Sequence, residues 1–532
     1  MPAGAHTASP LQPLEPVEPV SAPRPQGSPT AAVTGTPTRD DPLVAAASEV
    51  VGGPLGRHAI VGRRGWRPVA AVLMAASSVL VAAGVLERAP CLRSGWTTPD
   101  QFWHACYSDL PIVYQSSGLA AGVTPYVHAF GQPAHFLDQP VLSGAAMWLL
   151  ALGVPDGSGL VRQRWYFGLW AILATLAVAL LVLATVRSAP RRPWSAAHVA
   201  LSPVLVTAPL VSVDVLGVVL TSLGLWAWSR RKVPLAGVLL GLAVSSRSYP
   251  VVVILAIGLV AVRSGRLRSF AVLAGSSSLS FLVVTLPLLL RGGGQGVFST
   301  YRTWWNAGAS YGSPWQLPDL GHQVQAAYLL FRSQAGYPRS TSFWSSIRVS
   351  ALTPGGVTAL TVLGWLVALA AGALLALGTR RRPGVAEVAF VMLAIVVVTG
   401  KAVPPQAALW LLPLLALVGL RWRDHLIWAG MELAYFVAVW MYIAGFDKPD
   451  RGLPAGWFAA FLVCRLAVIS YLVWRVVQVS WRRGSSPRIH QDERAEQLDE
   501  PDRPDVSDEP DEPDELAGPL AGSRDRVLVR FD

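Results

Sequence analysis

The chain has 532 residues, of which 52% belong to the apolar and aromatic set and only 14% are charged. A soluble domain usually carries about 25% charged residues, so this composition excludes a single soluble domain, a disordered regulator and a disulfide-rich scaffold. The net charge is +11, but the basic residues stand in short runs between apolar segments, as in the cytoplasmic loops of membrane proteins. We therefore expect a polytopic, all-α membrane protein without a nucleic-acid partner.

The two ends of the chain are polar. Residues 1–60 are rich in Pro, Ala, Thr and Ser and have no apolar periodicity, which predicts a disordered N-terminal tail. The first apolar run begins only near residue 69, behind three arginines, and so predicts an uncleaved helix rather than a signal peptide. Residues 481–532 are expected to form a second disordered tail, in which the stretch 490–515 holds thirteen acids.

Thirteen apolar runs lie between the tails. They cover about 68–86, 139–154, 165–186, 196–211, 213–229, 233–247, 248–262, 269–290, 353–378, 384–400, 405–420, 426–443 and 455–480. Arginine clusters separate several of these runs, and such clusters mark the cytoplasmic loops of a membrane protein. The clusters lie at 187–192, 230–232, 263–268, 380–382 and 421–423. This pattern predicts a multi-pass protein of the cell membrane with both termini in the cytoplasm.

The run at 139–154 is expected not to cross the membrane. Residue 87 should lie outside and Arg187 inside, so an odd number of crossings must separate them, yet two apolar runs lie between. The run has Pro140 and Pro155 near its ends and about fourteen residues between them, whereas a span needs about 20. We interpret it as re-entrant or interfacial, which leaves about 12 crossings. The alternative is that it spans and the 187–192 loop departs from the charge rule.

Two further predictions concern the outer side. The segment 233–262 has a cytoplasmic arginine cluster at each end and a polar stretch ending in Pro250 at its middle. Two short helices should therefore turn there, with Arg247 at the outer tip. Large outer segments are expected at about 87–164 and 291–352, and their size favours chemistry or recognition on the outer face.

The first outer segment contains three acids, Asp100, Asp109 and Asp138. A carboxylate outside a membrane helix can act as a general base on an acceptor hydroxyl. Asp109 is the leading candidate, and the competing interpretation is that Ser108-Asp109 simply begins a short helix before Leu110-Pro111.

Charged residues near the membrane are the next candidates. Arg247 could hold a phosphate through its planar fork, with Lys401 as a second contact, or both could only anchor the chain at the boundary. Glu432 lies inside an apolar run, where an acid usually faces the bundle or a cavity. Asp214 opens the run at 213–229, where an N-cap is the strong alternative.

The second outer segment contains Trp304, Trp305 and His322. The tryptophans could stack on sugar rings, or they could belong to an interfacial aromatic belt. We expect a disulfide between Cys91 and Cys106, because both lie in the oxidising outer compartment, and the alternative is two buried free thiols. The third cysteine, Cys464, lies in a predicted membrane helix. No metal-ligand spacing or nucleotide-binding loop is visible, so neither a metal nor a cofactor is expected.

Three sequence motifs occur in a recognisable order. The first is Cys106-Tyr-Ser-Asp109-Leu-Pro-Ile-Val-Tyr114, followed by Gly118-Leu119 and Pro125-Tyr126. The second is Ser246-Arg247-Ser248-Tyr249-Pro250. The third runs from Lys401 through Pro404-Pro405-Gln406 to Trp410 and Pro413. Together they resemble actinobacterial GT-C integral-membrane glycosyltransferases, in the group of polyprenol-phosphate-mannose-dependent α-mannosyltransferases (GT87, DUF2029-like). The resemblance covers about residues 68–480 and implies a GT-C-like transmembrane domain over 61–480.

The resemblance implies an inverting transfer of a sugar from a polyprenyl-phosphate donor to a hydroxyl of a cell-envelope glycan or glycolipid on the periplasmic face. It gives Asp109 the role of catalytic base and Arg247 that of the residue that holds the lipid phosphate. Residues Tyr114, Tyr126, Tyr249 and Gln406 would line the substrate site. Mannose is the favoured sugar and arabinose the alternative. Ala407-Ala408 stand where phosphatidylinositol-mannoside enzymes of the group carry a His-His pair, so His322 is the remaining histidine that could assist the base.

Two other classes of function stay open at this point. A lipid or sugar transporter of the flippase kind would need polar residues deep in several helices, and a structural membrane protein would tolerate loss of Asp109. The expected partners of the enzyme are the lipid-linked donor, the envelope acceptor and membrane lipid. The sequence does not define the oligomeric state.

Overall fold

The computed structural model describes residues 66–335, 352–482 and 514–527. In these ranges all regular secondary structure is helical, and the only β-type pairing is an isolated bridge between Phe130 and His135. The N-terminal tail predicted over 1–60 lies outside the described residues.

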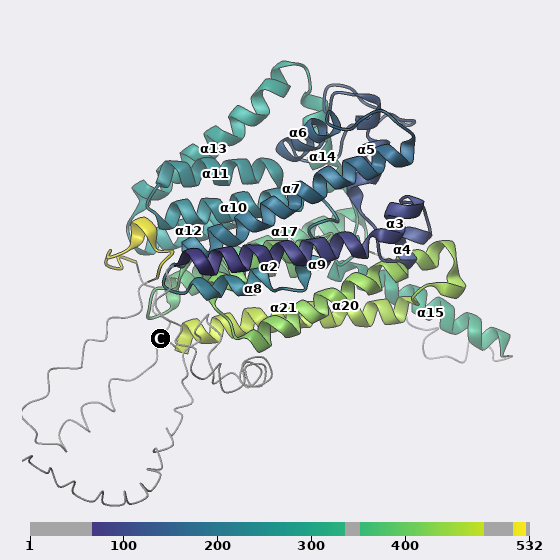
Figure 1. Cartoon of the computed structure of the whole chain (residues 1–532). Helices are drawn as coiled ribbons and strands as arrows, with labels where there is room; N and C mark the ends of the chain where they lie inside the picture. Colours follow the sequence, from purple (N-terminus) through teal and green to yellow (C-terminus); the bar gives the residue numbers. More distant parts are fainter. Residues whose placement is uncertain (1–65, 336–351, 483–513, 528–532) are drawn as a thin grey trace, which may run out of the picture.

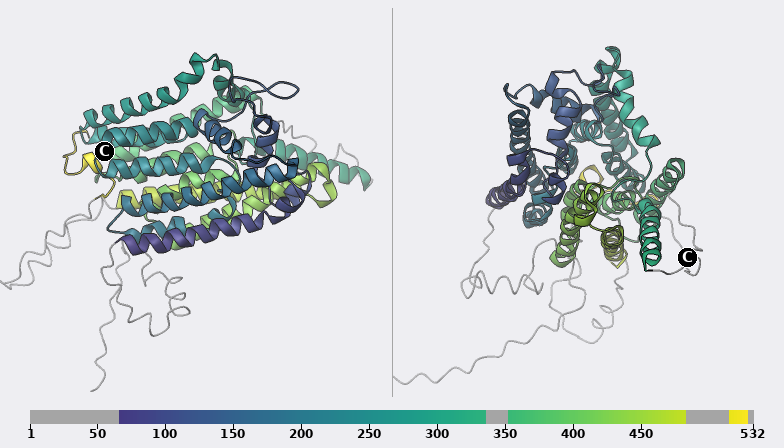
Figure 2. Two further views of the ribbon diagram at one scale, coloured as in Figure 1. Left: turned by 45° about the horizontal axis from the view of Figure 1, so that its top comes forward. Right: turned by 90° about the vertical axis from the view of Figure 1, so that its right-hand side faces the viewer.

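Six helices in the described part of the chain are long and apolar enough to cross a membrane. They are α2 (Trp66–Glu87), α7 (Gly159–Ser188), α13 (Leu267–Leu290), α17 (Pro354–Gly378), α20 (Trp422–Asp447) and α21 (Ala455–Arg482). Each coincides with a predicted apolar run, and the expected α-helical membrane protein is confirmed at this level. Figures 1 and 2 show these helices lying alongside one another in a single bundle.

Five shorter apolar helices complete the bundle. They are α10 (Asp214–Ser229), α11 (Val233–Ser246), α12 (Pro250–Arg263), α18 (Val385–Val398) and α19 (Ala408–Val418), the last preceded by η5 (Pro405–Ala407). The predicted run at 196–211 is not one helix: it consists of the end of η2 (Pro193–Ala196), α8 (Ala197–Ala200) and α9 (Val204–Thr207), which all pack on α2. Pro203 explains the break, because it restricts the residue before it and lacks an N–H donor.

The chain reverses direction from one bundle helix to the next, with η2, α8 and α9 forming the return between α7 and α10, so that the bundle has two distinct ends. The loop end carries α3 (Ala89–Ser94), α4 (Asp100–Trp103), α5 (Asp109–Ser116), η1 (Leu119–Ala121), α14 (Gly294–Asn306), η3 (Pro314–Gln316) and α15 (Leu317–Gln334). The five arginine clusters follow helices that run toward the other end, the tail end, where Figure 1 also places the C-terminal segment. The predicted grouping of these clusters on one side is therefore reproduced.

The apolar run at 139–154 forms one short helix, α6 (Val141–Ala151). Its 11 residues reach only about 16 Å, about half the hydrocarbon thickness of a bilayer, so α6 is too short to cross. It lies at the loop end, where the Ser143 hydroxyl hydrogen-bonds the carbonyl oxygen of Ser246 at 2.9 Å, next to the turn between α11 and α12. This favours the re-entrant or interfacial interpretation.

The C-terminal tail differs from its prediction. Residues 514–527, within the segment expected to be disordered, pack against the tail end of the bundle and bury Leu516 and Leu520. Apolar side chains and arginines that are distant in the sequence hold this segment, so the acidic, Pro-rich composition of the tail that leads into it did not reveal the contact. Residues 483–513 lie outside the described residues.

Candidate active site at the loop end

The first candidate, Asp109, lies at the start of α5. Ser108 is the N-cap: its side chain accepts a hydrogen bond from the Leu110 amide and donates one to the carbonyl oxygen of Leu210 at 2.7 Å. The Asp109 amide donates to the carbonyl oxygen of Val211, also at 2.7 Å. The cap of α5 is thus a serine, and the start of the helix is fixed to the segment just before α10.

The carboxylate of Asp109 is half-buried and has a phenol partner. The Tyr107 hydroxyl donates to its Oδ1 at 2.6 Å. Burial raises the pKa of Asp109 above the usual carboxyl range, while the hydrogen bond from Tyr107 and the positive charge of Arg247 oppose this shift. Asp214 adds a smaller upward effect on the same pKa. Asp109 therefore interacts electrostatically with both residues of the pair described next.

Arg247 forms an ion pair with Asp214. The Arg247 Nε lies 2.6 Å from Oδ1 of Asp214, and one Nη lies 2.5 Å from the same oxygen. Asp214 is the first residue of α10, but it does not cap that helix; its Oδ1 also accepts from the Ser212 hydroxyl at 2.8 Å. The Arg247 side chain is 19% exposed and that of Asp214 is 3% exposed, so the arginine presents the accessible side of the pair.

The third motif contributes to the same pair. The indole Nε1 of Trp410 donates to Oδ2 of Asp214 at 2.8 Å, and the Trp410 ring stacks on Tyr249 with a centroid distance of 5.0 Å. The Tyr249 hydroxyl donates to Thr221 Oγ1 at 3.1 Å. Three segments that are distant in the sequence, around Asp109, Arg247 and Trp410, therefore meet at the loop end. Tyr249 supports this arrangement as a buried packing residue.

A second carboxylate lies within electrostatic range of the same arginine. Asp138 has a pKa raised by burial, and both a hydrogen bond from Thr300 and the charge of Arg247 counteract this rise. Neighbouring Tyr126 is buried and donates its hydroxyl to the carbonyl oxygens of Gln139 and Pro140. Asp138 therefore belongs to the electrostatic surroundings of Arg247, while Tyr126 holds the loop that carries Asp138.

Lys401 lies at a different place. Its Nζ donates to the carbonyl oxygens of Trp304, Trp305 and Ala307 at 3.1, 2.8 and 3.0 Å, and it lies 4.7 Å from the centroid of the Trp304 ring. These carbonyls belong to the end of α14, which a cation stabilises. The three donors of the ammonium group are all engaged, so a phosphate would have to displace one of these bonds.

The remaining candidates are dispersed. Tyr114 is fully buried and stacks on Tyr166 at a centroid distance of 4.3 Å. Gln406 is buried, and its Oε1 has no hydrogen-bond partner among the described residues. Trp305 is 55% exposed and lines an apolar cavity of about 550 Å³ with the start of α17, and His322 is exposed on α15.

The acid in the membrane run, Glu432, has a partner that the sequence analysis did not identify. Arg465 of α21 contacts both carboxylate oxygens of Glu432, at 3.1 and 2.9 Å, and donates to the carbonyl oxygen of Val403 at 2.6 Å. Both side chains are buried. The pair thus connects α20 and α21 to the loop before η5, and the occurrence of one acid and one arginine in neighbouring apolar runs was the available signal.

The expected disulfide between Cys91 and Cys106 is present, with an Sγ–Sγ distance of 2.05 Å, and Cys464 is free. It joins α3 to the segment just before Asp109. Among the described residues, no group of three or more His, Cys, Asp and Glu side chains is arranged to hold a metal ion. The chain matches no family model, no curated protein and no solved structure.

Proposed function

We propose that this chain is a membrane glycosyltransferase that moves a sugar from a polyprenyl-phosphate donor to a hydroxyl of an envelope glycan or glycolipid. The observation that carries the proposal is that hydrogen bonds hold the start of α5 to the segment just before Asp214, so that Asp109 lies within electrostatic range of the Arg247–Asp214 pair. A general base and a phosphate-binding cation are the two groups that this reaction requires. In this proposal the loop end faces the periplasm, and the bundle makes about 12 crossings.

Asp109 suits the role of the base. It is reachable, because it is half-buried, and its raised pKa increases its affinity for the acceptor proton. In the transfer, the Asp109 carboxylate takes the proton of the acceptor hydroxyl while that oxygen bonds to the anomeric carbon. The bond between the anomeric carbon and the phosphate oxygen breaks on the opposite face, and the phosphate leaves with the electron pair. The configuration at the anomeric carbon is therefore inverted.

Arg247 suits the departing phosphate. Asp214 holds the Arg247 Nε and one Nη, and the other Nη has no hydrogen-bond partner among the described residues. The leaving phosphate gains one negative charge, which the guanidinium stabilises. Trp410 fixes the other oxygen of Asp214, so the arginine is oriented before the donor binds. Because Lys401 is engaged by three carbonyls, we assign the phosphate to Arg247 alone.

The experiment uses the purified protein in lipid vesicles with a radiolabelled polyprenyl-phosphate mannose, and with the arabinose donor as a second arm. Envelope extract from a deletion strain supplies the acceptor. We expect Asp109→Asn to lower turnover by about 10²–10⁴-fold while donor binding stays unchanged. Asp100→Asn is the matched control, because Asp100 is an exposed acid of the same outer segment.

The phosphate contact is tested in the same assay. Arg247→Ala should weaken donor binding by about tenfold or more, and Arg247→Lys should restore it only in part, because the planar fork is lost. Near-normal transfer by Asp109→Asn would remove Asp109 from the role of base and make Asp138, the other outer acid whose pKa the charge of Arg247 lowers, the next to test. Absence of transfer with both donors, despite donor binding, would count against the proposed enzyme.

A further inference from the structure

Residues 514–527 form a compact segment at the tail end of the bundle, which we call the clasp. It includes η7 (Gly518–Leu520), which packs on α10 and buries Leu516 and Leu520 in the main core. Gly518 has a φ of +52°, and a Cβ at this position would lie 2.3 Å from the carbonyl oxygen of Trp228, near the end of α10. The clasp therefore contacts α10 so closely that only glycine fits.

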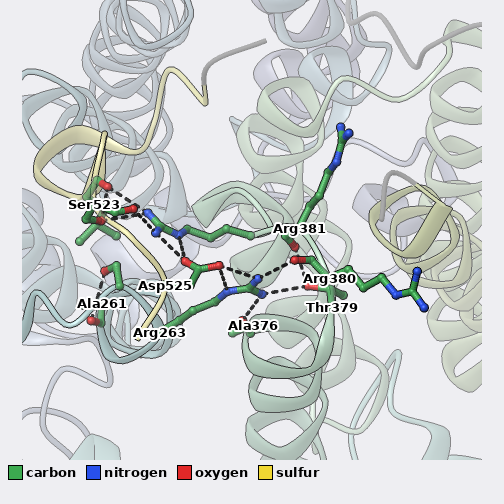
Figure 3. Close-up of polar contacts among 11 residues, drawn as sticks. Ala261, Arg263, Ala376, Thr379, Arg380, Arg381, Ser523 and Asp525 are labelled. Carbon is green, nitrogen blue, oxygen red and sulfur yellow. Dashed lines mark hydrogen bonds and ion pairs between the residues drawn. The ribbon is translucent and has the colours of Figure 1, made fainter. Parts of the chain in front are cut away.

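The second contact of the clasp is a carboxylate between two arginines. One oxygen of Asp525 accepts from the Arg263 Nε at 2.8 Å, and the other accepts from the Arg382 Nε at 2.7 Å. Arg382 also donates to the carbonyl oxygens of Leu520 and Ser523. Figure 3 shows Arg263, Asp525 and the residues around them in one connected network.

Arg263 is the last residue of α12 and is fully buried. Besides Asp525, it donates to the carbonyl oxygen of Ala376 at 2.9 Å and to Thr379 Oγ1 at 3.2 Å, both at the end of α17. Its own carbonyl oxygen accepts from the Arg526 amide at 2.8 Å. Asp525, which it shares with Arg382, is therefore the counter-ion of a buried arginine that joins α12 to α17.

The start of the clasp holds further elements. The Glu515 side chain accepts a hydrogen bond from the Arg191 amide at 2.7 Å, in the loop after α7. Asp514 lies beside the start of α18, where a Cβ on Gly384 would lie 3.6 Å from its Cγ, and it interacts with the Val385 amide. The clasp thus bridges the tail ends of α7, α10, α12, α17 and α18.

Two of these helices begin at the Arg247–Asp214 pair. Asp214 is the first residue of α10, and Arg247 lies three residues before Pro250, where α12 begins. The helices have 16 and 14 residues, which correspond to about 24 and 21 Å of rigid backbone between the pair and the clasp. We propose that the clasp is a conformational device that fastens the tail ends of α10 and α12 and thereby keeps Asp214 and Arg247 in register at the loop end.

This inference depends on the Arg247–Asp214 pair and not on the reaction assigned to it. When the clasp is released, the buried Arg263 loses its counter-ion and α10 loses its cover at Trp228. The two helices can then shift relative to each other, because their remaining polar links are the Arg247–Asp214 ion pair at the loop end and the hydrogen bond from Tyr249 to Thr221 in the middle of α10. Elements of this kind can transmit a change between distant sites when both sites bias their packing.

The test measures hydrogen–deuterium exchange of the full-length protein in lipid nanodiscs. We compare the wild type with Asp525→Asn, which removes the charge, and with Gly518→Val, which cannot fit against Trp228. Arg524→Gln is the matched control, because Arg524 is an exposed neighbour within the clasp. We expect both clasp variants to speed exchange about tenfold or more in the amides of residues 212–217 and 246–252, and the control to leave them unchanged.

Two results would overturn the proposal. Faster exchange confined to residues 261–266, 376–382 and 514–527 would show that the clasp is a local fastener without effect on the pair. Exchange of residues 516–526 that is equally fast in the wild type and in both variants would show that the clasp does not stay bound. If the clasp variants behave as expected while Asp109→Asn retains transfer, the proposed role of the clasp is supported and the proposed reaction, with Asp109 as base, is not.

Discussion

Single residues at the loop end lead to the clearest chemical prediction. The Tyr107 hydroxyl donates to Asp109 and thereby lowers the pKa of a carboxyl that burial raises. A base must be deprotonated, so kcat/KM should fall as the pH drops through the pKa of Asp109. Tyr107→Phe removes the stabilising donor, raises this pKa further and should shift the acid limb of the pH profile to higher pH.

The control for this prediction is Tyr114→Phe. Tyr114 is a buried residue of α5, the helix that begins with Asp109, and its hydroxyl has no hydrogen-bond partner among the described residues, so the pH profile should not change. A Tyr107→Phe profile that overlays the wild type would mean that the acid limb does not report Asp109.

The sequence identified some of these residues and missed others for a physical reason. Asp109 stood out because a carboxylate outside a membrane helix can act as a general base, and Arg247 because a charge at the membrane boundary is a functional hypothesis by default. Asp214 seemed explained by its place at the start of a helix, and only the folded chain brings Arg247 and Trp410 to it. Local patterns predict caps, whereas ion pairs between residues 33 positions apart depend on how the helices pack.

At the scale of elements, the Glu432–Arg465 pair joins two neighbouring membrane helices. Glu432→Gln leaves a buried guanidinium without a counter-ion, which typically costs about 3–5 kcal/mol of stability. We expect a lower thermal unfolding midpoint in detergent. The double variant Glu432→Leu with Arg465→Leu should recover part of this loss. A midpoint of the double variant below that of Glu432→Gln would show that the hydrogen bond from Arg465 to Val403 matters more than the ion pair.

The disulfide in the first outer segment makes a separate prediction. It closes a loop with a sequence separation of 15, so replacing Cys91 and Cys106 by serine should cost about 3 kcal/mol in the chain-entropy model. Unfolding of the double variant is compared with that of Cys464→Ser, which removes the exposed free thiol. Mass spectrometry of non-reduced peptides checks the bond, and alkylatable thiols at both positions would contradict it.

Element by element, most of the apolar runs predicted the helices well, including α13 and α19, which contain an internal proline. The runs at 68–86 and 165–186 became α2 and α7, but the run at 196–211 broke at Pro203. The clasp could not be predicted in this way. It follows an acidic, Pro-rich stretch that indicates disorder, and the contacts that hold it involve Arg263 and Arg382, which the sequence explains equally well as topology signals.

The whole molecule has two ends of different character. The arginine clusters and the clasp lie at the tail end, while α5, α6, α14 and the disulfide lie at the loop end. Positive charge is retained on the cytoplasmic side of a membrane, and disulfides persist in an oxidising compartment. The arginine clusters and the disulfide favour the same orientation, with the loop end outside. They are independent observations, because the first depends on the distribution of charge and the second on the redox state of the compartment.

This orientation is tested by labelling intact cells with a membrane-impermeant maleimide, in a Cys464→Ser background. Single cysteines replace Gly157 and His322 at the loop end and Pro190 at the tail end, and all three positions are exposed. We expect labelling at 157 and 322 in intact cells and at 190 only after the cells are opened. Labelling at 190 in intact cells together with protection of 157 would reverse the orientation. It would also place Asp109 and Arg247 in the cytoplasm, where a sugar nucleotide rather than a lipid-linked donor would be the substrate to test.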